Sequence, residues 1–303
     1  MSSSAATANG LAAIAAPARH GRPPSLQRER RWALIASYVV LIVSAIGFLV
    51  PPYFELVTSL KTSQAIGSGA DPWFARHPYF GNFLGIIEDP QFQTFFLNSA
   101  MVTVVVVAIS IVIAVFAAYA LARMRFFGSQ AFATGVFLTY LVPESLLFIP
   151  LFKVLAFLHL INSVWALALV WPTLSVPFCT WIMIGYFSSI PRELDEAAMI
   201  DGASHLQMLW KIFIPVAMPG IIAAMIFAFT VCWGDFLYPL AFLFTGKQMV
   251  LTAGIVSVLI HGDVLDWGHI MAANVLASAP PVLIYAFLMD YYVAGLTAGA
   301  TKG

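Results

Sequence analysis

Four polar or aromatic side chains in apolar stretches are the candidates for binding a solute. Asp235 lies close to Trp233, Glu144 follows Pro143, and Asn274 stands among small and apolar residues. A carboxylate in apolar surroundings is costly to bury, so it usually faces a cavity, a path or a partner. Acids combined with aromatic faces can bind a polar organic molecule.

Each candidate also has a structural interpretation, and the sequence leaves both open. Asp235 could be an acid that stays hydrated near an aqueous interface, and Glu144 could mark a helix end broken by Pro143. Asn274 could bond to a neighbouring helix through its amide. Only the placement of the side chains can separate solute binding from these roles.

The chain carries no motif for covalent or phosphoryl chemistry. It has no GxxxxGK[ST] phosphate loop, no HExxH and no GxSxG nucleophile turn. Cys179 and Cys232 are too far apart for a CxxC site or a disulfide framework. We therefore expect no catalytic residue, no metal and no cofactor. Four histidines without metal-ligand spacing are expected at interfaces or on the surface: His159, His205, His261 and His269.

The composition excludes a soluble protein. Charged residues make up 9% of the 303 residues and the set AVILMFWYC makes up 61%, whereas a typical soluble protein is about 25% charged. The 14 Lys and Arg balance the 14 Asp and Glu, so no basic field is present to attract nucleic acid. The chain is therefore predicted to be an integral membrane protein.

Long stretches between the charged residues predict the fold class. A membrane-spanning helix needs roughly 20 apolar residues, and six stretches are about that long or longer. Bilayer strands need only about 9 to 11 residues and alternate in polarity, which these stretches do not. We predict an all-α integral membrane protein with six transmembrane helices. They are expected near residues 32–57, 95–121, 130–150, 164–187, 216–240 and 271–293.

Basic residues predict the orientation. With a cytoplasmic N-terminus, the inner segments hold ten Lys and Arg and the outer segments hold four, which favours both termini in the cytoplasm. Residues 1–31 are predicted to be a disordered cytoplasmic tail, and residues 32–303 a transmembrane domain. Residues 241–270 are expected to include an exposed outer loop with Gly254, Gly262 and Gly268.

The inner loop, residues 188–215, contains two helix signatures in succession. Its acidic beginning suits a helix N-terminus, Gly202 provides a break, and Ser204 with Gln207 forms a capping-box pattern. The net charge of the loop, −2, disfavours nucleic acid and favours a protein partner. The second helix is expected to carry one apolar stripe: Leu206, Leu209, Trp210, Phe213 and Ile214.

This loop resembles the EAA loop of binding-protein-dependent ABC import permeases. The run from Glu196 to Pro215 follows the pattern EAA-x3-G-x9-I-x-L-P, with Ile in place of Leu at position 214. Asp201-Gly-Ala-Ser, Asp266-Trp-Gly and the C-terminal residues are similar to the carbohydrate-uptake branch, in particular to the smaller membrane subunit of the maltose importer. We refer to residues 188–215 as the EAA loop.

The resemblance implies a type I ABC importer permease in the inner membrane of a bacterium, without enzymatic activity of its own. Its partners would be a second permease subunit, an ATPase dimer that binds the ATP, an external solute-binding protein, a sugar or polyol substrate, and membrane lipid. The alternative is a stand-alone secondary transporter, for which buried ion-coupling residues and inverted repeats are not evident. The resemblance implies these ATPase-coupling residues: Glu196, Ala197, Ala198, Asp201, Gly202, Ile212 and Pro215.

Overall fold

Helices make up nearly all of the part of the chain that the structure describes. The computed structural model describes residues 24–69, 71–124, 126–261 and 264–297. Within them, two short strands, β1 (Ile260–His261) and β2 (Val264–Leu265), form one antiparallel pair. The predicted all-α class is confirmed.

The first helix, α1 (Pro24–Ser59), begins earlier than predicted. Residues 24–31, assigned from the sequence to a disordered tail, are helical, because proline suits a first helical position, where its missing N–H has no partner to lose. The rest of that tail lies outside the described residues. Contacts divide the chain between Tyr53 and Phe54, so the part of α1 before Phe54 is described by itself. From Arg30 onward this part is exposed along its whole length.

Three further helices are long and apolar enough to cross a membrane without interruption. They are α4 (Pro90–Arg123), α7 (Trp165–Ser189) and α14 (Trp267–Thr297), and they correspond to the second, fourth and sixth predicted helices. α7 continues through Pro172 and Pro177. With α1, the described residues contain four continuous candidate spans.

The third and fifth predicted helices are not continuous, and in this respect the prediction is wrong. α5 (Ser129–Tyr140) and α6 (Glu144–Phe157) meet at 95°, because Pro143 lacks the N–H that would continue the helix. The segment His205–Val216 meets α11 (Met218–Gly234) at 80°. α11 ends at Gly234, whereas the fifth helix was predicted to extend to residue 240. If each bent pair is one span, six spans result, so the count of six stays a prediction.

The second unit, from Phe54 onward, packs around three helices. α4 lies along α7, and α11 contacts α4, α7 and α14. Small residues four positions apart allow the backbones to approach closely. Ala114 and Ala118 on α4, and Ala224 and Ala228 on α11, are completely buried.

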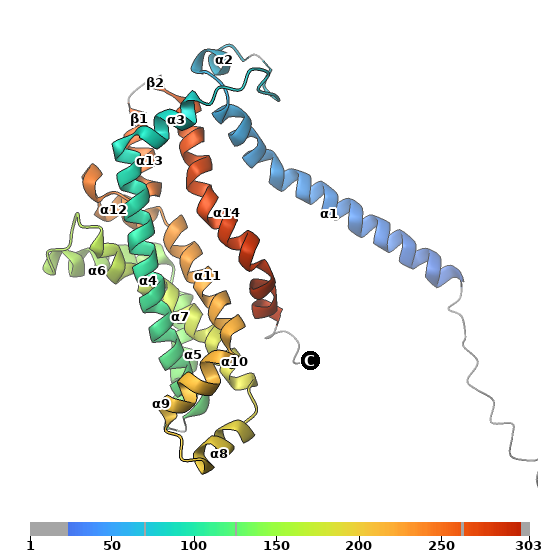
Figure 1. The fold of residues 1–303 in the computed structure, drawn as a ribbon, viewed down its shortest axis with the longest axis vertical. Coiled ribbons are helices and arrows are strands. Elements are labelled where there is room, and N and C mark those ends of the chain that lie inside the picture. The colour runs from blue at the N-terminus through green and yellow to red at the C-terminus, as the bar shows by residue number, and fades with distance from the viewer. Residues whose placement is uncertain (1–23, 70, 125, 262–263, 298–303) are drawn as a thin grey trace, which may run out of the picture. The chain divides into compact units, whose positions relative to one another are not determined.

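Short helices gather at the two ends of this unit. Figure 1 shows α8 and α9 at one end of α4 and α7, and α2, α3 and the strand pair near the other. The short elements are α2 (Ser63–Gly67), α3 (Gly81–Glu88), α8 (Glu193–Ile200), α9 (His205–Met208), the π-helical turn η1 (Leu209–Phe213), α10 (Ile214–Val216), α12 (Leu237–Phe242), the 3-10 turn η2 (Gly246–Gln248) and α13 (Leu251–Leu259).

Candidate functional site

The first candidate region is the EAA loop, where α8 and α9 are joined by a tight turn. The turn places Gly202 in the left-handed region with φ +77°. The Ala203 amide donates to the Ala198 carbonyl oxygen at 2.9 Å, and the Gly202 amide donates to the Met199 carbonyl oxygen at 3.0 Å. These bonds form a Schellman turn, for which glycine is favoured because a side chain would be strained there. The predicted break at Gly202 is confirmed.

The first turns of both helices in the loop contain the residues that the sequence predicts. The first turn of α8 contains the acids Glu193, Asp195 and Glu196, where the helix dipole favours negative charge. At α9, the Ser204 amide donates to Gln207 Oε1 at 2.8 Å and the Gln207 amide donates to Ser204 Oγ at 3.3 Å. The capping box is therefore confirmed.

The apolar stripe predicted for the second helix is wrong in part. Leu209 and Phe213 are buried and Ile214 is half-buried, whereas Leu206 and Trp210 are exposed. The π-helical turn η1 is wider than an α-helical turn, so the regular helix spacing used for the prediction does not hold through this segment. Leu206 and Trp210 consequently belong to the outer surface of the loop.

The coupling residues that the resemblance implies divide into two sets. Ala198 is buried in an apolar cluster with Phe213 and Ala118, so its small side chain permits close packing within the chain itself. Ile212 is half-buried against the same cluster. The exposed members are Glu196, Ala197, Asp201, Gly202 and Pro215.

Sequence reasoning missed the side chains that attach this loop to α4. Tyr119 Oη lies 3.2 Å from His205 Nδ1 at the start of α9, and Arg123 forms an ion pair with Asp195 on α8. Tyr119 and Arg123 are four residues apart and share one helix face. This spacing was the only signal in the sequence, and it does not identify the partners.

The second candidate region consists of two cavities beside α11. The first has a volume of about 460 Å³ and lies at the break between α5 and α6. Glu144 lines this cavity together with Thr139, Tyr140 and Thr173. Val231 of α11 lines the cavity as well. The backbone oxygen of Glu144 accepts a 2.9 Å hydrogen bond from Tyr238. Sequence reasoning found only the acid in this group.

The second cavity has a volume of about 430 Å³ and contains two of the predicted residues, Trp233 and Asn274. Glu55, which follows Pro51 and Pro52 on α1, lines it as well. Trp233 is held by a 2.9 Å hydrogen bond from Nε1 to the Ala277 carbonyl oxygen and by stacking on Phe229. Residues 231 and 233 of a helix point in nearly opposite directions, so the two cavities lie on different faces of α11.

Asp235 lines neither of these two cavities. Its Oδ2 accepts a hydrogen bond from Trp171 Nε1 at 2.7 Å, and its Oδ1 accepts one from the Leu237 amide at 3.0 Å. Its backbone oxygen accepts a 2.6 Å hydrogen bond from Thr252. Both carboxylate oxygens are thus engaged by donors of the chain itself, a role that the sequence-based interpretation as a hydrated interfacial acid did not include.

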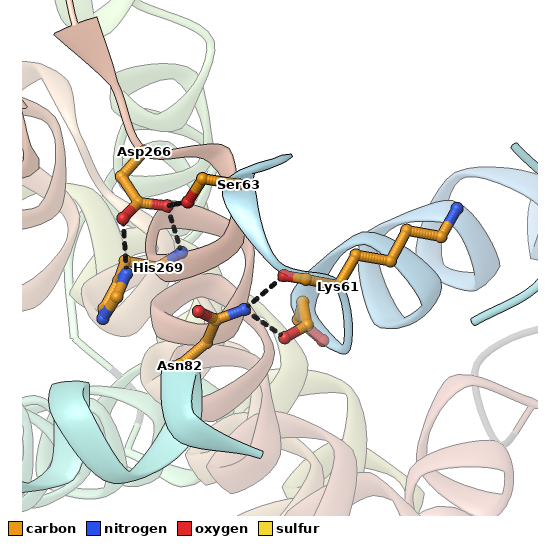
Figure 2. Close-up of polar contacts among 6 residues, drawn as sticks. Lys61, Ser63, Asn82, Asp266 and His269 are labelled. Atoms are coloured by element: carbon orange, nitrogen blue, oxygen red, sulfur yellow. Dashed lines mark hydrogen bonds and ion pairs between the residues drawn. The ribbon is translucent and has the colours of Figure 1, made fainter. Parts of the chain in front are cut away.

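A polar cluster connects the segment after α1 to the start of α14 (Figure 2). Asp266 Oδ2 lies 2.7 Å from His269 Nδ1, and Ser63 donates to Asp266 Oδ1 at 3.1 Å. Asn82 donates to the carbonyl oxygens of Ser59 and Lys61, both at 2.8 Å. Burial by itself would raise the pKa of Asp266, but the hydrogen bonds from His269 and Ser63 hold it below its ordinary value.

Gly254 and Gly268 belong to packed helices, which corrects the expected exposed loop at these two positions. Gly262 lies outside the described residues. A Cβ at Gly254 would lie 2.4 Å from the Phe95 ring, and one at Gly268 would lie 2.6 Å from Asn82 Nδ2. Both glycines are buried, so they permit close approach of neighbouring elements.

Comparisons with known proteins place the chain in a family. Residues 110–297 match the family described as binding-protein-dependent transport system inner membrane component. A sulfoquinovosyl glycerol transport system permease of Agrobacterium fabrum is 34% identical, covering 88% of this chain and 93% of the relative. A trehalose/maltose transport system permease of Thermococcus litoralis is 31% identical, covering 88% and 97%.

The fold has a counterpart among solved structures. A chain of a bacterial ABC transporter involved in the import of the acidic polysaccharide alginate superimposes with a TM-score of 0.78 at 23% identity, covering 88% of this chain and 98% of that one. This likeness shows the fold. Because the family match extends over more than half of the sequence and includes the complete EAA loop, the chain belongs to the family of binding-protein-dependent transport system inner membrane components.

Proposed function

We propose that this chain is a permease subunit of an ATP-driven ABC importer for a sugar or sugar-like solute. The observation that carries the proposal is the EAA loop, a pair of capped helices with Glu196 exposed and with buried contacts to α4. The relatives named above carry a sulfoquinovosyl glycerol and trehalose or maltose, which supports a glycoside or polyol. Membership of this family argues against a stand-alone secondary transporter.

The proposed complex contains three further components. A second permease subunit completes the path, an external binding protein delivers the solute, and an ATPase dimer binds ATP. Glu196 would provide the polar contact to a groove of the ATPase. Ile200, which is 86% exposed, and Met199 would provide the apolar contact, because exposed apolar patches of this kind mark protein interfaces.

The two cavities beside α11 support a path for a hydroxylated solute. Glu144 and Tyr140 present a carboxylate and an aromatic ring in the first cavity. Trp233 and Asn274 present a ring and an amide in the second. Polar groups placed in a mostly apolar cavity orient a small ligand, so we propose that Glu144, Trp233 and Asn274 contact the solute. Asp235 instead would hold the helices that form the path.

Transport by the whole complex tests this function. The four components would be reconstituted in proteoliposomes with ATP on the ATPase side and offered labelled disaccharides, a sulfonated glycoside, a polyol and an amino acid. We expect saturable uptake of a sugar or polyol that requires both ATP and the binding protein. Uptake that persists without the ATPase, or that is confined to the amino acid, would contradict the proposal.

A further inference from the structure

A buried ion pair joins the last residue of α4 to the first turn of α8. Arg123 Nη1 lies 3.4 Å from Asp195 Oδ2, and the side chains are only 4% and 15% exposed. Arg123 Nη2 donates a 2.6 Å hydrogen bond to the carbonyl oxygen of Ile190, which follows the end of α7. The guanidinium carbon lies 4.7 Å from the centre of the Phe213 ring in η1. One side chain of α4 thus contacts three other elements.

Stability alone does not explain this arrangement. Burying two charges removes their hydration, and a buried ion pair is often no more stable than well-packed apolar side chains of similar volume. In the part of the chain that the structure describes, Arg123 Nε and Asp195 Oδ1 are buried without a hydrogen-bond partner. Such atoms destabilise the folded state. What the pair provides is a fixed position and direction for α8.

The pair lies where movement of the loop would enter the membrane helices. Asp195 faces α4, whereas the adjacent Glu196 is exposed toward the proposed ATPase contact. One turn earlier on α4, Tyr119 contacts His205 of α9. Both helices of the EAA loop are therefore attached to one face of α4, and α4 in turn packs along α7 and α11.

We propose that Arg123 is the positioning residue that makes α8 and α4 move as one body when the ATPase displaces the EAA loop. This inference rests on the proposed function. The apolar contacts of Ala198 and Phe213 hold the loop against the helices, but apolar packing is non-directional. The ion pair and the bond to Ile190 add direction. Without them, ATP hydrolysis would continue while the membrane helices fail to follow.

The test uses the complete complex and compares solute transported per ATP hydrolysed. Arg123→Gln and Asp195→Asn each remove one charge at similar volume. We expect both complexes to assemble and hydrolyse ATP, with transport per ATP lowered by roughly tenfold. The double variant should be no worse than either single variant, because both remove the same interaction. Arg123→Lys should recover only part of the transport, because an ammonium lacks the planar fork.

Arg192 offers a matched control, because it is an exposed arginine at the beginning of α8, the helix that carries Asp195. Arg192→Gln should leave transport per ATP within about twofold of the wild type, since solvent-exposed charges contribute little. Equal losses in Arg192→Gln and Arg123→Gln would overturn the proposal, as would wild-type transport per ATP in Arg123→Gln. Failure of both single variants to assemble would also overturn it and would make the pair a folding contact.

A distance measurement tests the same idea without any solute. Spin labels at Glu193→Cys on α8 and Phe116→Cys on α4 occupy exposed positions, and the native Cys179 and Cys232 are buried. In the wild type the distance should stay the same with and without ATP, and in Arg123→Gln it should broaden or shift. An unchanged distribution in Arg123→Gln would contradict the proposal. If the wild-type complex takes up no sugar, the proposed function fails while this measurement still reports on the pair.

Discussion

Trp171 Nε1 donates a 2.7 Å hydrogen bond to Asp235 Oδ2, which links the first half of α7 to the residue that follows the end of α11. The same carboxylate accepts the Leu237 amide at the beginning of α12, and the backbone oxygen of Asp235 accepts the Thr252 hydroxyl from α13. A single residue thus positions four helices around the break in the fifth predicted span.

Removal of this carboxylate should lower the stability of the protein and leave the order of solute preference unchanged. We expect Asp235→Ala to lower the free energy of unfolding by about 2 kcal/mol, because a charged hydrogen-bond acceptor is lost and Trp171 Nε1 is left unpaired. Asp235→Asn should have a smaller effect. Unfolding in mixed detergent micelles measures the change, and Trp171→Phe added to Asp235→Ala should add little. A changed order of solute preference with unchanged unfolding would show instead that Asp235 contacts solute.

Gly202 should be sensitive to any side chain. Its φ of +77° makes Gly202→Ala unfavourable by about 1–2 kcal/mol. Gly202→Asp adds charge at the Schellman turn and should abolish coupled uptake while the protein remains in the membrane. The control is Gly135→Ala on α5, where a Cβ would meet nothing within 4 Å and φ is ordinary. Wild-type uptake in Gly202→Asp would rule out the coupling role of this turn.

Gly254 should be sensitive for a steric reason. A Cβ there would lie 2.4 Å from the ring of Phe95, which is only 2% exposed. We expect Gly254→Ala to destabilise by about 1–3 kcal/mol, since overpacking shifts neighbouring side chains. Combining it with Phe95→Leu should recover part of the loss. If the two changes are simply additive in the unfolding measurement, the proposed clash is wrong.

Glu144 is expected to act on the solute and not on stability. Glu144 lines the first cavity, so Glu144→Gln should change the KM for uptake severalfold while ATP hydrolysis in response to the binding protein persists. Glu88→Gln, an exposed acid on α3, serves as the control and should behave like the wild type. The same KM in both variants would remove Glu144 from the path.

Acid should weaken the contact between α2 and α14. The pKa of Asp266 is held below its ordinary value by His269 and Ser63, so the ionised carboxylate stabilises the folded protein. This stabilisation is complete above the unfolded pKa of about 4 and is lost as the pH falls through the lower folded value. Hydrogen exchange of the α2 amides, expressed as protection factors, should show the loss. Asp266→Asn should remove this pH dependence, and an unaltered profile would contradict the assignment.

Some local structure could be predicted because its cause is local. The capping box of Ser204 and Gln207 and the left-handed turn at Gly202 depend on backbone groups only a few residues away. The break before Glu144 was anticipated as one interpretation of Pro143, for the same reason. The apolar stripe from Leu206 to Ile214 was misjudged because regular helix spacing was assumed through a segment that contains a π-helical turn.

The sequence by itself determined that the chain lies in a membrane and where its EAA loop begins and turns. Charge scarcity and the length of apolar stretches follow from the thickness of a bilayer, and both can be read from residue order alone. The tertiary structure decided that Arg123 meets Asp195, that Trp171 meets Asp235, and that Glu55 and Trp233 line the same cavity. These partners are dozens of residues apart, and helix periodicity fixes the face on which a side chain lies but not the helix that covers it.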